Sequence, residues 1–93
     1  MHPESPVVRL LSKLVSIPSI NPSLDQESVG CGEEPVTAFI EETSQNAGLV
    51  TERQKVATGR DNLLVRLTPV GEVKYRILLA PHLDVVPAPL EAF

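Results

Sequence analysis

The sequence predicts an α/β fold in which two helices precede three strands of a mixed, helix-covered β-sheet. Two segments in the first half of the chain repeat apolar residues at spacings of three and four, as one face of a helix does. From Leu49 the periodicity changes to two, which is typical of strands. The run Ile77–Ala80 is apolar without interruption, which indicates a strand buried on both faces. With 93 residues, the chain corresponds to one domain or to part of one.

The first helix is predicted to begin where Ser5 precedes Pro6, because serine is a good N-cap and proline suits the first helical position. Its apolar face consists of Val7, Val8, Leu11, Leu14 and Val15. The helix should end near Ser16, since Pro18 disfavours helical backbone before it. The next segment, Ile17–Gly32, is rich in Pro, Ser and Gly and is expected to be a loop. Loops of this length are usually functional or mobile.

The second helix is predicted to begin near Glu33. The acidic pair Glu33 and Glu34 suits the positive end of a helix dipole, and Pro35 falls in the first turn. The expected inner face consists of Val36, Phe39, Ile40, Thr43 and Ala47. Gly48 should stop the helix, because glycine adopts the left-handed conformation without a Cβ clash.

Three strands are predicted to follow the helices. Leu49–Ala57 has the polar pattern of an edge strand, and Asn62–Leu67 that of a strand nearer the core. Gly59–Asn62 has the composition of a turn between them. Thr68–Lys74 is short enough to form a hairpin into a third strand, Tyr75–Ala80, at the centre of the sheet.

Charge and composition argue against two classes of partner. Eight Lys and Arg against twelve Asp and Glu give a formal net charge of −4, and the basic residues are dispersed. One Tyr and two Phe are too few for a base-stacking surface, so we do not expect nucleic acid as a partner. We expect no membrane partner either, because no segment approaches the about 20 apolar residues of a membrane span. Arg9 and Lys13 also interrupt the apolar run that a signal peptide would need. A single cysteine, Cys31, indicates a reducing compartment, and we expect the cytoplasm.

A candidate site follows the third predicted strand. His82 comes just after Tyr75–Ala80, at the strand end where open α/β sheets bind ligands. His82 and Asp84 should lie on the same side of an extended segment, while Leu83 and Val85 should point into the core. A carboxylate beside a histidine can accept its second ring N–H and strengthen it as a metal ligand. Taken alone, the same spacing also fits a structural hydrogen-bonded pair.

The motif "HLDVVP", which begins at His82, resembles the first metal-binding motif of the M20 family of metallopeptidases and deacylases. This family includes acetylornithine deacetylase, succinyl-diaminopimelate desuccinylase, aminoacylase and the glutamate carboxypeptidases. "LLSKLVSIPSINP" is similar to the family's opening helix and its Ile-Pro-Ser turn, "GEEPVTAFIEETSQNAGL" to its second helix, and "GRDNLLVRL" to a following strand. Val7–Pro87 therefore follows the N-terminal order of the family. One departure is Pro81, which replaces the small residue that usually precedes the histidine and has no backbone donor.

The resemblance implies a two-zinc amidohydrolase that cleaves an amide bond in N-acyl amino acids or small peptides. His82 would bind one of two zinc ions, for which Co²⁺ could substitute, and Asp84 would be the active-site aspartate that orients the imidazole. In the family, the other ligands, the general-base glutamate and a lid and dimerisation domain lie further along the chain. Residues 1–93 are therefore expected to be a truncated N-terminal part of the catalytic domain of a zinc hydrolase that can form a homodimer, and to be inactive alone.

Two alternatives accompany this expectation. Cys31, between two glycines, could act as a thiol nucleophile, although no histidine motif supports it. The chain could also be a complete, non-catalytic module that binds a partner through an uncovered sheet edge or an exposed apolar face and retains the motif as a remnant. The remaining candidate ligands have simpler explanations as helix-start or solvated residues: His2, Asp25, Glu27, Glu33, Glu34 and Glu91.

Overall fold

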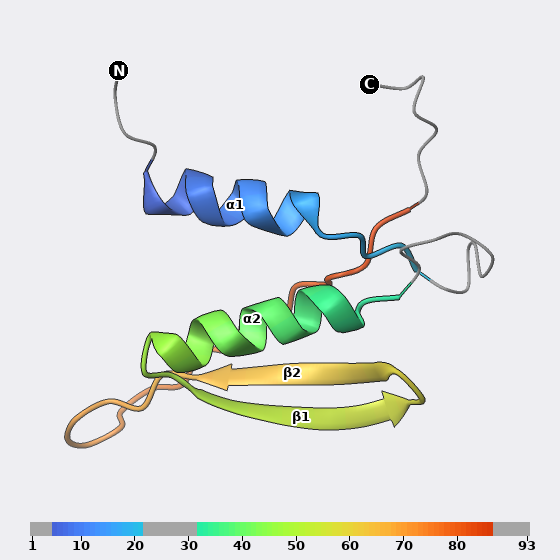
Figure 1. Cartoon of the computed structure of the whole chain (residues 1–93). Helices are drawn as coiled ribbons and strands as arrows, with labels where there is room; N and C mark the ends of the chain where they lie inside the picture. Colours follow the sequence, from blue (N-terminus) through green and yellow to red (C-terminus); the bar gives the residue numbers. More distant parts are fainter. Residues whose placement is uncertain (1–4, 22–31, 87–93) are drawn as a thin grey trace.

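The computed structural model describes residues 5–21 and 32–86 (Figure 1). Within these residues the element order is α1 (Pro6–Ser16), α2 (Glu34–Asn46), β1 (Val50–Ala57) and β2 (Arg60–Arg66). β1 and β2 form an antiparallel sheet, and α2 packs against both strands. The described part of the chain therefore contains both helices and strands, as predicted, but its sheet has two antiparallel strands rather than the three strands of a mixed sheet.

Helix α1 forms through the signals that predicted it. The Ser5 side chain accepts a hydrogen bond of 3.2 Å from the main-chain N–H of Val8, and Pro6 occupies the first turn. Ile17 ends the helix in an extended conformation before Pro18. No residue of α1 is buried, so its apolar face remains open to solvent.

Helix α2 begins one residue later than expected and ends before Gly48, whose positive φ of 84° confirms the predicted stop. At its start, the hydroxyl and the main-chain N–H of Thr37 both donate to the carbonyl of Glu33, each at 2.9 Å. Val36 and Thr37 are 3% and 1% exposed, respectively. Ala47, which was expected on the inner face, lies beyond the helix and is exposed.

The hairpin pairs Val50 with Arg66 at its open end and Ala57 with Arg60 beside the turn. Its turn contains Gly59 at a φ of 72°, and the register shifts between Lys55 and Ala57. The second strand begins two residues earlier than predicted, because the turn occupies only the two residues before Arg60.

The predicted third strand is wrong. Tyr75–Ala80 has no strand structure and is not buried on both faces: Tyr75, Ile77 and Leu79 are 89%, 87% and 82% exposed, respectively. The expected hairpin through Thr68–Lys74 is likewise absent. A strand needs a neighbour to satisfy its backbone donors and acceptors, and no described residue pairs with this segment.

After this exposed segment, the chain forms main-chain hydrogen bonds with the residues that follow α1. Ile20 and Val85 form an isolated parallel bridge, in which the N–H of Val85 donates to the carbonyl of Ser19 at 2.9 Å. The N–H of Asn21 donates to the carbonyl of Val85 at 3.0 Å. This bridge places the segment around His82 beside the turn that follows α1 (Figure 1).

Candidate functional site

The two candidate residues face one another. His82 Nδ1 lies 3.3 Å from Oδ1 of Asp84 and 3.0 Å from the main-chain oxygen of Asp84. The side chain of His82 is 85% exposed, whereas that of Asp84 is 28% exposed. The expected placement of both side chains on one side of the segment therefore holds, although no strand precedes them.

This geometry assigns the tautomer of the neutral imidazole. Both atoms near His82 Nδ1 are oxygens that can only accept, provided that Asp84 is ionised. Nδ1 must therefore carry the proton, and Nε2 keeps its lone pair on an exposed ring. A neutral imidazole in this state is suited to bind a metal through Nε2.

Asn21 is a third member of the site. Its Nδ2 donates a hydrogen bond of 2.7 Å to Oδ2 of Asp84, 63 positions along the chain. This hydrogen bond, reinforced by the main chain of Asp84 and by His82, holds the pKa of Asp84 below its usual value. The sequence placed Asn21 in the predicted loop Ile17–Gly32, but nothing in it connected Asn21 with Asp84.

The side chains at this site fit one metal ligand, His82, and one residue that orients it, Asp84. A catalytic zinc takes about three protein ligands plus a water. Among residues 5–21 and 32–86, no group of three or more His, Cys, Asp or Glu side chains lies close enough to hold an ion. Asp84 has one oxygen toward Asn21 and the other toward His82, which suits an orienting residue. The candidates His2, Asp25, Glu27, Cys31 and Glu91 lie outside the described residues.

An apolar pocket of about 200 Å³ opens beside His82. Leu83 and Val85, which were expected to point into the core, line this pocket instead, and Val85 is 49% exposed. Pro81 is exposed and lies outside any strand, so its missing donor removes no ladder hydrogen bond. The remaining lining residues come from α1, the turn after it and α2: Leu14, Val15, Ser19 and Val36.

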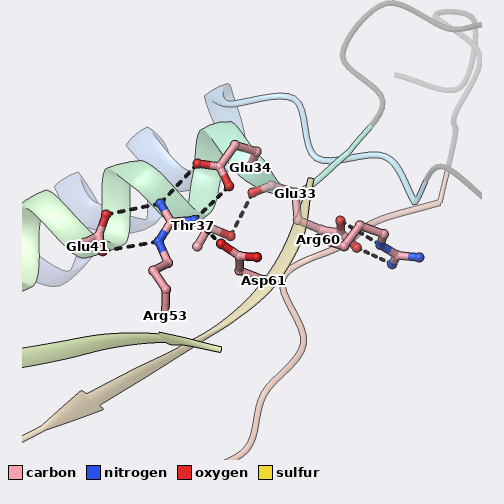
Figure 2. A network of polar contacts seen from close by, with 7 residues as sticks. All are labelled: Glu33, Glu34, Thr37, Glu41, Arg53, Arg60 and Asp61. Atoms are coloured by element: carbon pink, nitrogen blue, oxygen red, sulfur yellow. Dashed lines mark hydrogen bonds and ion pairs between the residues drawn. The ribbon is translucent and has the colours of Figure 1, made fainter. Parts of the chain in front are cut away.

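The acidic residues at the start of α2 belong to a separate polar network (Figure 2). Arg53 on β1 contacts Glu34 at 2.7 Å, Glu41 at 3.1 Å and Asp61 at 3.3 Å. Arg60 on β2 pairs with Glu33 through two hydrogen bonds. Glu33 and Glu34, which the sequence predicts as helix-start residues, are thus engaged with guanidinium groups, as are Glu41 and Asp61.

Comparison of the chain with known protein families, with curated proteins and with solved structures gives no match. Neither helix of the described residues has the length and apolar character needed to cross a membrane. The assignment of a function therefore rests on the geometry around His82 and on the sequence motifs.

Proposed function

We propose that residues 1–93 form the N-terminal part of the catalytic domain of a two-zinc amidohydrolase similar to the M20 family. One observation carries the proposal: His82 Nδ1 faces Asp84, which leaves Nε2 of an exposed ring free to bind an ion. The sequence motifs support it, because "HLDVVP" follows the segments of α1, α2 and β2, whose sequences resemble the N-terminal order of that family.

In this proposal, His82 holds Zn²⁺ or Co²⁺ and Asp84 holds the imidazole in its Nδ1–H state. Two zinc ions would activate a water and polarise the carbonyl of an amide bond. The substrate is an N-acyl amino acid or a small peptide. The other ligands and the general base are supplied by parts of the protein outside the described residues, and a second domain would allow dimerisation. We place this enzyme in the cytoplasm.

The test uses the complete protein as its gene encodes it. We expect release of free amino acid from N-acyl amino acids when Zn²⁺ or Co²⁺ is added. His82→Ala should abolish this activity, and Asp84→Asn should lower it about 10- to 100-fold, because Asp84 acts through the ligand. His2→Ala is the matched control and should leave the activity unchanged. Activity that survives His82→Ala, or no hydrolysis with either metal, would remove the assignment.

The alternative is a non-catalytic module that binds a partner through the exposed apolar segment Tyr75–Ala80. The exposure of Ile77, Leu78 and Leu79, at 77% or more, favours it. Size-exclusion chromatography and circular dichroism of the 93-residue chain separate the two functions. A cooperatively folded monomer that does not respond to zinc supports the module, whereas an associated or poorly folded chain supports the incomplete enzyme.

A further inference from the structure

We propose that Asn21 is the positioning residue that fixes the carboxylate of Asp84 and thereby strengthens the preference of His82 for its Nδ1–H tautomer. The importance of this role for metal binding rests on the proposed function, but the hydrogen-bond chain itself does not. Asn21 Nδ2 lies 2.7 Å from Oδ2 of Asp84, and Oδ1 of Asp84 lies 3.3 Å from Nδ1 of His82. Three side chains from two distant segments therefore form one chain of polar contacts.

Main-chain hydrogen bonds at Asn21 and two residues before it support this arrangement. The carbonyl of Ser19 accepts from the N–H of Val85, and the N–H of Asn21 donates to the carbonyl of Val85. These two hydrogen bonds hold the turn after α1 beside Val85, the residue that follows Asp84. The backbone of Asn21 is thus held by a hydrogen bond while its side chain contacts Asp84. Ser19, at the start of this turn, is buried at 5% exposure.

The chemistry of an amide suits this position. An asparagine NH₂ group donates a hydrogen bond without bringing a charge, so Asp84 keeps its full negative charge for the imidazole. A lysine or arginine would neutralise the carboxylate, and an aspartate would repel it. With Oδ2 held by Asn21, the carboxylate is restrained from turning and Oδ1 stays toward His82 Nδ1.

Loss of the Asn21 side chain should therefore change the tautomer populations of the His82 imidazole. The carboxylate of Asp84 would be free to rotate into solvent, and only the main-chain oxygen of Asp84 would remain near His82 Nδ1. The imidazole then has one acceptor at Nδ1 instead of two, so its preference for the Nδ1–H tautomer weakens. The Nδ1–H form of His82 should then give way to a mixture, and the lone pair on Nε2 should be available for only part of the time.

The direct test is ¹⁵N–¹H NMR of the metal-free, ¹⁵N-labelled complete protein, as its gene encodes it, at a pH where the imidazole of His82 is neutral. The ring nitrogen shifts and couplings should report mainly Nδ1–H at His82, and Asn21→Ala should shift them to a mixture of tautomers. Gln45→Ala is the matched control, because it removes another side-chain amide bond, that from Gln45 to Thr51 at 2.8 Å. It should leave the His82 signals unchanged, and an unchanged tautomer in Asn21→Ala would overturn the inference.

Asn21→Asp gives a second variant of nearly identical shape, which keeps the test decisive if the alanine variant fails to fold. It should disturb the tautomer at least as strongly, because it replaces a donor by a second carboxylate.

Addition of Zn²⁺ to the same samples should shift the His82 signals. Zinc binding should be weakened about 3- to 10-fold in both Asn21 variants, which is a smaller loss than for a direct partner of a ligand. Zinc binding with an unchanged tautomer overturns only the role of Asn21. A changed tautomer without zinc binding to His82 upholds that role and counts against the metal site.

Discussion

Arg53 shows how much of this structure depends on one side chain. It extends from β1 to Glu34 and Glu41 on α2 and to Asp61 on β2. Its side chain is 25% exposed, so these contacts are partly shielded from solvent. The hydrogen bonds that Arg53 donates to Glu34 and Glu41 raise the pKa of Arg53 above its usual value. Because Val36 is the one buried apolar side chain in the described part of the chain, polar contacts carry much of the attachment of α2 to the hairpin.

Arg53→Met should lower the free energy of unfolding by about 1 to 2 kcal/mol, because it removes charged hydrogen bonds and leaves three carboxylates near one another. Urea denaturation followed by circular dichroism at neutral pH measures this loss. Arg66→Met is the matched control on the same hairpin. Arg66 lies 3.9 Å from Glu52, and both side chains are about half exposed, so the expected loss is below about 0.5 kcal/mol. Equal losses in the two variants would contradict the role given to Arg53.

The free energy of unfolding of the unmodified chain should depend on acid pH differently from that of Arg53→Met. The hydrogen bond from Arg53 lowers the pKa of Glu34 from its ordinary value of 4.5. A carboxyl group with a lowered pKa in the folded state stabilises that state above the unfolded pKa, and this contribution is lost as the pH falls through the folded pKa. The stability difference between the unmodified chain and Arg53→Met should therefore shrink as the pH falls below about 4.5. A difference that stays constant would mean that Glu34 contributes nothing through its charge.

Helix α1 shows what local signals achieve with little packing. Its cap and its proline set where it begins, yet none of its residues is buried. Contact with α2 includes Lys13, whose Nζ lies 5.9 Å from the ring centroid of Phe39. An 11-residue helix is shorter than those that persist alone in water. The helicity of α1 should therefore depend strongly on its cap.

Ser5→Ala should destabilise α1 by about 1 kcal/mol, because the N–H of Val8 loses its acceptor. The Cα chemical shifts of residues 6–16 measure the helical population directly. Ser12→Ala is the control within the same helix, where alanine replaces an exposed serine of lower helix propensity and should raise the population slightly. A fall in helicity in both variants, or in neither, would show that the cap does not determine this helix.

The molecule as a whole leaves much of its apolar surface open. In addition to the face of α1, the segment Tyr75–Ala80 presents Ile77, Leu78 and Leu79 to solvent. Exposed apolar residues that follow one another in this way favour association. The charge of −4 opposes association but does not cover the segment.

The 93-residue chain should therefore self-associate as its concentration rises, and Leu79→Lys should move this association to higher concentration. Sedimentation equilibrium measures the change. Val70→Lys introduces the same charge at a fully exposed valine outside the segment and should have a smaller effect. If the two substitutions act equally, net charge rather than the apolar segment controls association.

Parts of this architecture could be predicted because they depend on nearby residues. The cap at Ser5, the end of α1 before Pro18 and the stop at Gly48 involve hydrogen bonds or backbone preferences within a few positions. The facing of His82 and Asp84 belongs to the same class, since the two residues are separated by only Leu83. Their proposed role as a metal ligand and its support stays a prediction.

The sequence by itself thus determined both helices, the hairpin and the His82–Asp84 pair, because each depends on short-range geometry. Only the tertiary structure decided that Tyr75–Ala80 is not a strand, because a strand is defined by a neighbour and an apolar run does not provide one. It also decided that Asn21 holds Asp84 and that Arg53 joins α2 to the hairpin. Those contacts depend on where distant parts of the backbone meet, and no local preference encodes that meeting.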